Sequence, residues 1–193
     1  MKYFTYKLIA TANGWDEKGP RAEKKARVRF EQACRDYQRQ LLRLRNRVSP
    51  PAWRFFRYAI QDESLHDATL IELTIGDDIV GHTPPRDYFW YRNSAKTRAR
   101  LKFVNFRGNL TRSFECIGVR RFRCDMSVDS PLGRNLGDLY AYELRAMDQN
   151  NLGLSFLFAS GAEIEIEFQK LNFRSERIRL TSKAKSVYVP LLR

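Results

Sequence analysis

The sequence predicts an α+β fold in which an N-terminal helical pair packs on a curled antiparallel sheet of about six or seven strands, either a sandwich or an open barrel. Three observations predict it. Apolar residues recur at helical spacing over residues 21–62, a period-two pattern begins after Ser64, and three strand patterns joined by very short turns occupy residues 138–169. We expect residues 1–64 to form a short strand plus a basic helical segment. Residues 65–193 are expected to form an antiparallel β domain, and the two parts together one unit.

In the N-terminal part, residues 2–10 predict a short strand and residues 11–20 a loop. A long helix is expected over residues 21–47, because its apolar residues follow a heptad-like spacing that forms one narrow seam. The seam comprises Arg27, Phe30, Cys34, Tyr37, Leu41, Leu44 and Val48. Ser49-Pro50-Pro51 ends this helix and begins a second one over residues 51–62, since serine caps a helix and proline suits its first turn.

In the β part, we expect a strand over residues 65–76, with Ile71, Leu73 and Ile75 on one face. An aromatic strand is expected over residues 86–92 and another strand over residues 98–107. Within residues 112–126 the apolar positions switch parity, from Ile117 and Val119 to Phe122 and Cys124. This switch predicts a bulge or bend near Arg120 and Arg121.

The clearest structural pattern covers residues 138–148, 152–159 and 162–169. Asn150-Asn151 and Ser160-Gly161 are turn residues typical of tight hairpins. The last strand alternates strictly, with Glu163, Glu165 and Glu167 expected to face outward. These carboxylates stand about 7 Å apart along one strand, so we expect them to pair with arginines across strands rather than to hold one cation.

The charge of the chain is concentrated in one stretch. The whole chain carries a net charge of +13, and residues 21–57 hold twelve Lys or Arg against three acids. Such a concentration indicates a negatively charged partner or a crowded, solvated helix. We find no apolar run of the roughly 20 residues that a membrane span needs. There is no signal-peptide pattern, and the three cysteines form no CxxC pair, so we expect a cytoplasmic protein.

The candidate binding residues are arginines of the helical segment. Arg35, Arg39, Arg43 and Arg47 recur every four residues, and the first three lie opposite the apolar seam by helical-wheel arithmetic. Two interpretations stay open: a solvated face softened by Glu31 and Asp36, or a surface that binds phosphates or carboxylates. The complete candidate set is Arg35, Arg39, Arg43, Arg47, Arg54 and Arg57.

Aromatic residues next to Arg54 and Arg57 could form either a nucleic-acid-binding surface or part of the hydrophobic core. Trp53, Phe55, Phe56 and Tyr58 lie close to these arginines, and Tyr88–Tyr91 form a second cluster. Interleaved basic and aromatic residues are typical of base-stacking platforms, but large aromatic residues also dominate hydrophobic cores. Both interpretations stay open.

A second candidate, a polar site, comprises His66, Asp67 and Glu143. A histidine oriented by a carboxylate is the minimal acid–base unit. However, adjacent residues on a strand face opposite ways, and Asp67 also suits a backbone-bonding role at a junction. His82 has no second histidine at ligand spacing, so we expect no metal site and no cofactor.

Several short motifs resemble a bacterial family of uncharacterised proteins. They are the opening Met1-Lys2-Tyr3-Phe4-Thr5, the strand entry Leu65-His66-Asp67, Tyr142-Glu143-Leu144, and the Ser160-Gly161 turn followed by Glu163-Ile164-Glu165-Ile166. The resemblance implies the order of fold elements and an immunity or antitoxin role in a bacterial toxin system. It implies no enzymatic activity.

From these observations we expect a non-enzymatic binding protein that engages an acidic protein partner through its helical segment. The alternative is an RNA- or DNA-binding protein that uses the same arginine-rich helix. We expect either a monomer or a homodimer, with no membrane contact.

Overall fold

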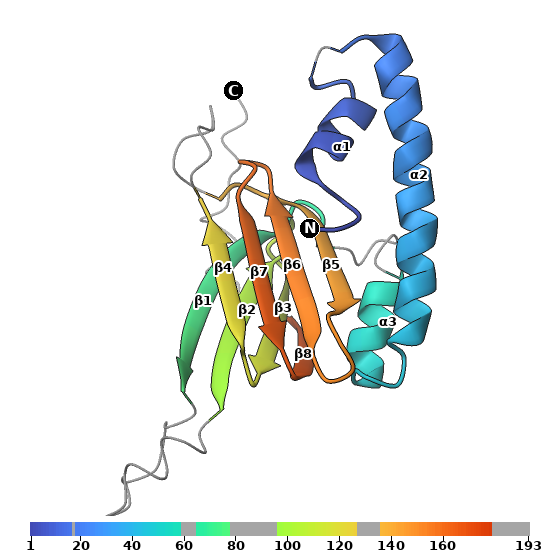
Figure 1. Cartoon of the computed structure of the whole chain (residues 1–193). Coiled ribbons are helices and arrows are strands. Elements are labelled where there is room, and N and C mark those ends of the chain that lie inside the picture. Colours follow the sequence, from blue (N-terminus) through green and yellow to red (C-terminus); the bar gives the residue numbers. More distant parts are fainter. Residues whose placement is uncertain (17, 59–64, 78–95, 127–135, 179–193) are drawn as a thin grey trace, which may run out of the picture.

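The structure, a computed structural model, describes residues 1–16, 18–58, 65–77, 96–126 and 136–178. Two four-stranded antiparallel sheets lie face to face, and three N-terminal helices lie along one side of them (Figure 1). The expected α+β fold is confirmed, with the sheet divided into the two layers of a sandwich.

The described residues form eight strands. The first sheet has the order β1-β2-β3-β8 and the second has the order β4-β7-β6-β5. The strands are β1 Thr69–Asp77, β2 Thr97–Val104, β3 Leu110–Ile117, β4 Arg121–Asp125, β5 Leu139–Ala146, β6 Leu152–Phe158, β7 Glu163–Phe168 and β8 Lys170–Arg177. The hairpins predicted over residues 138–169 are confirmed as β5, β6 and β7, and Glu163, Glu165 and Glu167 alternate with buried neighbours as expected.

The helices are α1 Tyr6–Ala12, α2 Pro20–Arg43 and α3 Pro50–Tyr58. Helix α2 begins with Pro20 after Gly19, and α3 begins with Pro50, because proline lacks the N–H group that a first turn leaves unpaired anyway. The prediction that the long helix extends to residue 47 is wrong. Its last turn tightens at Leu44, whose N–H donates to the Leu41 carbonyl three residues back. Residues 59–62, expected to continue the second helix, lie outside the described residues.

The short strand predicted over residues 2–10 is also wrong, because Tyr6–Ala12 form helix α1. The Thr5 hydroxyl caps the helix by accepting from the N–H of Leu8 at 3.4 Å. Ile9, Ala10 and Ala12 are buried, and helix α1 packs against α2. In a segment this short, apolar residues fit a helical face as well as a strand face, so tertiary packing decides.

The predicted parity switch in residues 112–126 marks a passage between sheets rather than a bulge within one strand. Strand β3 ends at Ile117, and the chain passes through Gly118, which has φ +69°, into β4 of the second sheet. The return passage at Gln169 lies beside it, because the N–H of Gln169 donates to the Ile117 carbonyl at 3.0 Å. Cys116 and Cys124 therefore lie in different sheets.

Strand β1 begins at Thr69, and a register shift between Leu70 and Glu72 leaves Ile71 in a bulge. The predicted common face of Ile71, Leu73 and Ile75 is therefore wrong for Ile71, since a bulged residue leaves the alternation. The aromatic strand expected over residues 86–92 lies outside the described residues.

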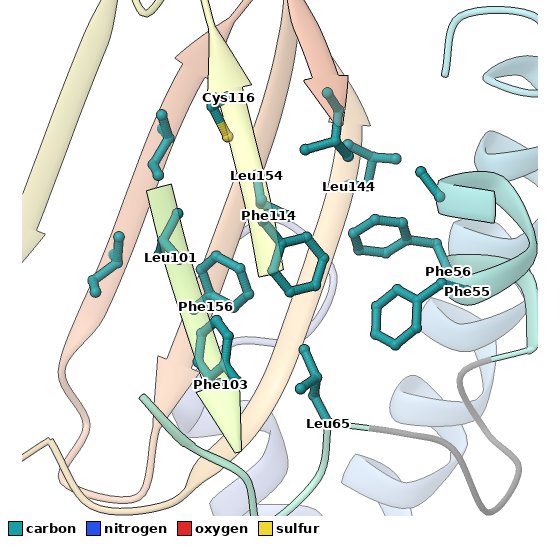
Figure 2. Close-up of a cluster of buried hydrophobic side chains, with 14 of the residues drawn as sticks. Phe55, Phe56, Leu65, Leu101, Phe103, Phe114, Cys116, Leu144, Leu154 and Phe156 are labelled. Atoms are coloured by element: carbon teal, nitrogen blue, oxygen red, sulfur yellow. The ribbon is translucent and has the colours of Figure 1, made fainter. Parts of the chain in front are cut away.

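One hydrophobic core joins the helical segment to both sheets. Figure 2 shows Phe55 and Phe56 of α3 pointing toward Phe114 of β3 at the side of the sandwich. Between the sheets, Phe103 of β2 lies 4.9 Å from Phe156 of β6, measured between ring centroids. Burial of such a side chain contributes about 1.5–3 kcal/mol, so α3 and the sheets stabilise each other.

Candidate functional site

The candidate site is the outer face of α2, which runs along the side of the molecule (Figure 1). Its orientation is fixed by the inner face, where Tyr37 and Leu41 are buried. The Tyr37 hydroxyl accepts a hydrogen bond from the N–H of Leu144 at 2.9 Å, and the Gln40 amide donates to the Leu144 carbonyl at 3.0 Å. Leu144 lies on edge strand β5, so α2 pairs with a backbone edge that would otherwise be open.

This orientation turns a row of exposed cations outward. We call this surface the cationic face of α2. It comprises the exposed side chains of Arg21, Lys24, Lys25, Val28, Arg35, Arg39, Leu42 and Arg43. At 100° per residue these positions fall within about 60° of Val28 on the helical wheel, a sector that also holds the exposed side chains of Glu31 and Gln32. The predicted placement of the arginines opposite the buried seam therefore holds for Arg35, Arg39 and Arg43.

Two of these arginines also contact polar residues of their own helix. Arg35 lies 3.9 Å from Glu31 and donates to the side-chain oxygen of Gln32 at 3.0 Å, while Arg39 pairs with Asp36. A hydrogen bond from Gln32, together with Arg39, lowers the pKa of Asp36. Both guanidinium groups remain 59% and 69% exposed, so these pairs soften repulsion without hiding the cations.

The other candidate arginines do not belong to this face. Because α2 ends at Arg43, Arg47 leaves the helical row, and its guanidinium donates to the Asn151 carbonyl at 3.0 Å in the β5–β6 turn. Arg57 donates to the side-chain oxygen of Gln38, and Arg54 is exposed on α3. Arg47 and Arg57 thus have contacts that join elements of the fold.

The aromatic residues beside Arg54 and Arg57 lie in the core. Phe55 and Phe56 are buried, and the Trp53 indole donates to the Leu41 carbonyl at 3.2 Å. The Phe55 ring stacks on Phe173 of β8 at 4.6 Å. These rings hold α3 on the sheets. The Tyr58 side chain and Tyr88–Tyr91 lie outside the described parts of the structure.

The polar site predicted from His66, Asp67 and Glu143 is divided by the structure. His66 and Asp67 do meet, with Nδ1 and Oδ1 2.9 Å apart, because Asp67 has a positive φ of 60° in a turn rather than a strand. Glu143 is fully buried and accepts hydrogen bonds from the N–H groups of Lys2, Tyr3 and Phe4 at 2.9, 2.6 and 2.6 Å. Its carboxylate is therefore used to hold the N-terminal segment.

Two acidic side chains of β7 lie opposite or pair with arginines of neighbouring strands, as the sequence predicts. Glu165 pairs with Arg145 of β5, and Glu167 lies opposite Arg121 of β4 in the register. Within the described residues, no group of three or more His, Cys, Asp or Glu side chains is arranged to hold a metal ion. Nor is any helix of the described segments long and apolar enough to cross a membrane.

Sequence reasoning missed two members of the cationic face, Val28 and Leu42, whose side chains are 58% and 53% exposed. Helical-wheel arithmetic would have found them, because both positions lie between the cations and away from the seam. It also missed Tyr37 and Gln40 as partners of the β5 edge, which no local pattern indicates.

Comparison with known proteins adds no relative: no protein-family model, no curated protein and no solved structure matches this chain. The resemblance based on the short motifs stays a prediction.

Proposed function

We propose that this chain is a non-enzymatic binding protein that engages an acidic protein partner through the cationic face of α2. The observation that carries the proposal is the row of exposed Lys and Arg side chains on a helix that packs on α1 and is hydrogen-bonded to β5. Rigid anchoring lowers the entropy lost when such a face binds a partner.

The length of the face suits a protein interface. Helix α2 has 24 residues and is about 36 Å long at about 1.5 Å per residue. A standard interface buries about 800 Å² on each partner, and one long helix with its flanks can supply that area. Exposed Val28 and Leu42 add apolar contacts between the cations, and arginine is enriched at interface centres.

The same details favour a protein partner over nucleic acid. Single-stranded nucleic acid is usually bound by cations together with exposed aromatic rings on which bases stack. Here Phe55 and Phe56 are buried, and the described part of α2 displays aliphatic side chains between its cations instead. The resemblance of the short motifs to a family of uncharacterised proteins implies an immunity or antitoxin role, and we therefore propose, more finely, that the acidic partner is a bacterial toxin.

The proposal is tested by charge reversal on the face. The triple variant Arg35→Glu, Arg39→Glu, Arg43→Glu is compared with a control of equal charge change, Arg107→Glu, Arg120→Glu, Lys170→Glu, at exposed positions elsewhere. Tagged proteins are used for pull-down from bacterial lysate, including cells that express the protein encoded by the adjacent gene. We expect wild type and control to retain an acidic protein that the face variant loses at least tenfold.

Nuclease treatment separates the alternatives. Retention of the acidic protein after nuclease supports direct protein binding. Loss after nuclease, with a steep fall in affinity for a short RNA as salt increases, would favour the nucleic-acid alternative. If the face variant retains the same proteins as wild type, the cationic face is only a solvated surface and the proposal fails.

A further inference from the structure

A cavity of about 450 Å³ lies away from the cationic face, among the N-terminal segment, α1, the inner side of α2, α3 and β5. Six of its twelve lining residues are Phe or Tyr: Phe4, Phe30, Tyr37, Phe56, Tyr140 and Tyr142. Its volume falls within the roughly 300–1,000 Å³ of small-molecule sites, which are mostly apolar with a few polar groups.

The aromatic wall is held in place by contacts among its own members. Phe4 lies 5.2 Å from Tyr37 in an edge-to-face arrangement, and Phe56 lies 5.9 Å from Tyr142 in another. The hydroxyls of Tyr37 and Tyr142 accept hydrogen bonds from the backbone N–H groups of Leu144 and Leu65. These contacts fix the positions of the two hydroxyls, and each hydroxyl keeps an O–H that can still donate. The two tyrosines therefore offer a ligand their ring surfaces and a phenolic donor.

The polar groups of the wall come from Gln38, Asn13 and His66. The Gln38 side-chain oxygen accepts from the guanidinium of Arg57, so the Gln38 NH₂ group is the part of this amide that can donate to a ligand. Arg57 does not itself line the cavity, but this contact places its positive charge next to the Gln38 side chain. The His66 ring stacks over Tyr140 at 6.4 Å and is oriented by Asp67.

We propose that this cavity binds a small aromatic carboxylate. The ring of the ligand would pack among the aromatic side chains, where offset and edge-to-face contacts are favourable beyond simple burial. Its carboxylate would accept from the Gln38 amide, with Arg57 as the nearby cation. The His66–Asp67 pair, which sequence analysis singled out, would form part of the wall of this site. The site is separate from the proposed partner-binding face.

Alkylation of Cys34 reports directly on whether the cavity is occupied, because Cys34 lines the cavity and is partly exposed. Cys124 on β4 is exposed and does not line the cavity, so it serves as an internal control in the same molecule. Burial raises the pKa of the Cys34 thiol, and partial loss of solvent around the sulfur raises that of Cys124, so both are expected to react slowly. The experiment measures iodoacetamide alkylation of each cysteine by peptide mass spectrometry, with and without naphthoate.

We expect naphthoate at about ten times its Kd to slow alkylation of Cys34 roughly tenfold, since only the free protein reacts. Alkylation of Cys124 should not change. Cyclohexanecarboxylate, which has the head group but no aromatic ring, should protect Cys34 at least tenfold less well at equal concentration. Naphthalene-methanol, which has the ring but no charge, should also bind more weakly.

Variants locate the site. Cys34→Phe fills the cavity and should abolish naphthoate binding in calorimetry, whereas Cys124→Phe, the same replacement at an exposed position, should leave it unchanged. Ala141→Leu fills the cavity from β5 and replaces Cys34→Phe in the binding test if Cys34→Phe does not fold. Absence of protection at Cys34, or naphthoate binding that survives both filling variants, would overturn the proposal.

Discussion

At the scale of single residues, Glu143 shows how a buried charge can organise a fold. Its carboxylate is fully buried, yet it accepts from three consecutive backbone N–H groups at 2.6–2.9 Å. An unpaired charge in such a position would be very costly, whereas one that accepts several amide hydrogen bonds is well solvated by the protein. Glu143 therefore ties residues 2–4 to the middle of β5.

We predict that Glu143→Gln detaches the N-terminal segment. The amide retains one acceptor oxygen and places an NH₂ group against backbone donors, so we expect a loss of about 2–3 kcal/mol in unfolding free energy. Hydrogen exchange of the amides of residues 2–4 should become much faster. Glu72→Gln, at an exposed position on β1, is the control and should change neither quantity. Unchanged exchange in Glu143→Gln would contradict this role.

Two tyrosines, the buried Tyr37 and the partly buried Tyr142, predict a loss of stability at high pH. Burial raises the pKa of Tyr142 from 10.0 to about 12, and it raises that of Tyr37 well above its ordinary value. Because the folded state favours the protonated phenol, this contribution is complete below pH 10 and is lost as pH rises through the folded-state pKa. A rise of two units corresponds to about 3 kcal/mol for Tyr142.

The measurement is urea unfolding across pH 9 to pH 12, combined with absorbance titration of the phenolates. Tyr142→Phe should make unfolding free energy less dependent on pH in this range, and one phenolate should disappear from the late part of the titration. Tyr6→Phe, at an exposed position, is the control. Equal pH slopes in wild type and Tyr142→Phe would show that the Tyr142 phenol is not desolvated in the folded protein.

At the scale of elements, the sequence predicted the structure correctly where a turn or a helix cap determines it. The β5–β6 and β6–β7 hairpins were predicted because Asn150-Asn151 and Ser160-Gly161 determine the turns, and α3 because Ser49-Pro50 begins a helix. Helix α1 was not predicted, because its seven residues carry too little periodicity to distinguish helix from strand. Packing of Ile9 and its neighbours against α2 decides that choice.

The candidate site could likewise be predicted only where helical geometry determines the position of a side chain. The outward placement of Arg35, Arg39 and Arg43 follows from helical geometry alone, and the structure agrees with it. Arg47 was placed in the row wrongly, since the end of α2 depends on the turn that brings α3 back to the sheets. The aromatic cavity was not foreseen, because its wall combines residues from Phe4 to Tyr142 that only tertiary structure brings together.

At the scale of the whole molecule, α3 joins the two sheets at the side where the N-terminal helices lie. The Phe55 ring stacks on Phe173 of β8 in the first sheet and on Tyr142 of β5 in the second, with centroids 4.6 and 5.5 Å apart. The guanidinium carbon of Arg112 also lies 5.4 Å from the centre of this ring. A short helix thereby closes one side of the sandwich, so helices and sheets are expected to unfold as one cooperative unit.

Removal of the Phe55 ring tests whether the helices and the sheets unfold as one cooperative unit. Phe55→Ala should lower unfolding free energy by about 3–5 kcal/mol, because it deletes a ring packed against both sheets and leaves a cavity. Phe106→Ala is the matched control, since that ring is 69% exposed, and it should change stability by less than about 0.5 kcal/mol. In both variants, tryptophan fluorescence and far-UV circular dichroism should give coincident urea transitions. A helical transition that precedes the loss of the sheets in wild type would show that α3 does not join them energetically, and that the cationic face of α2 rests on a separately folding layer.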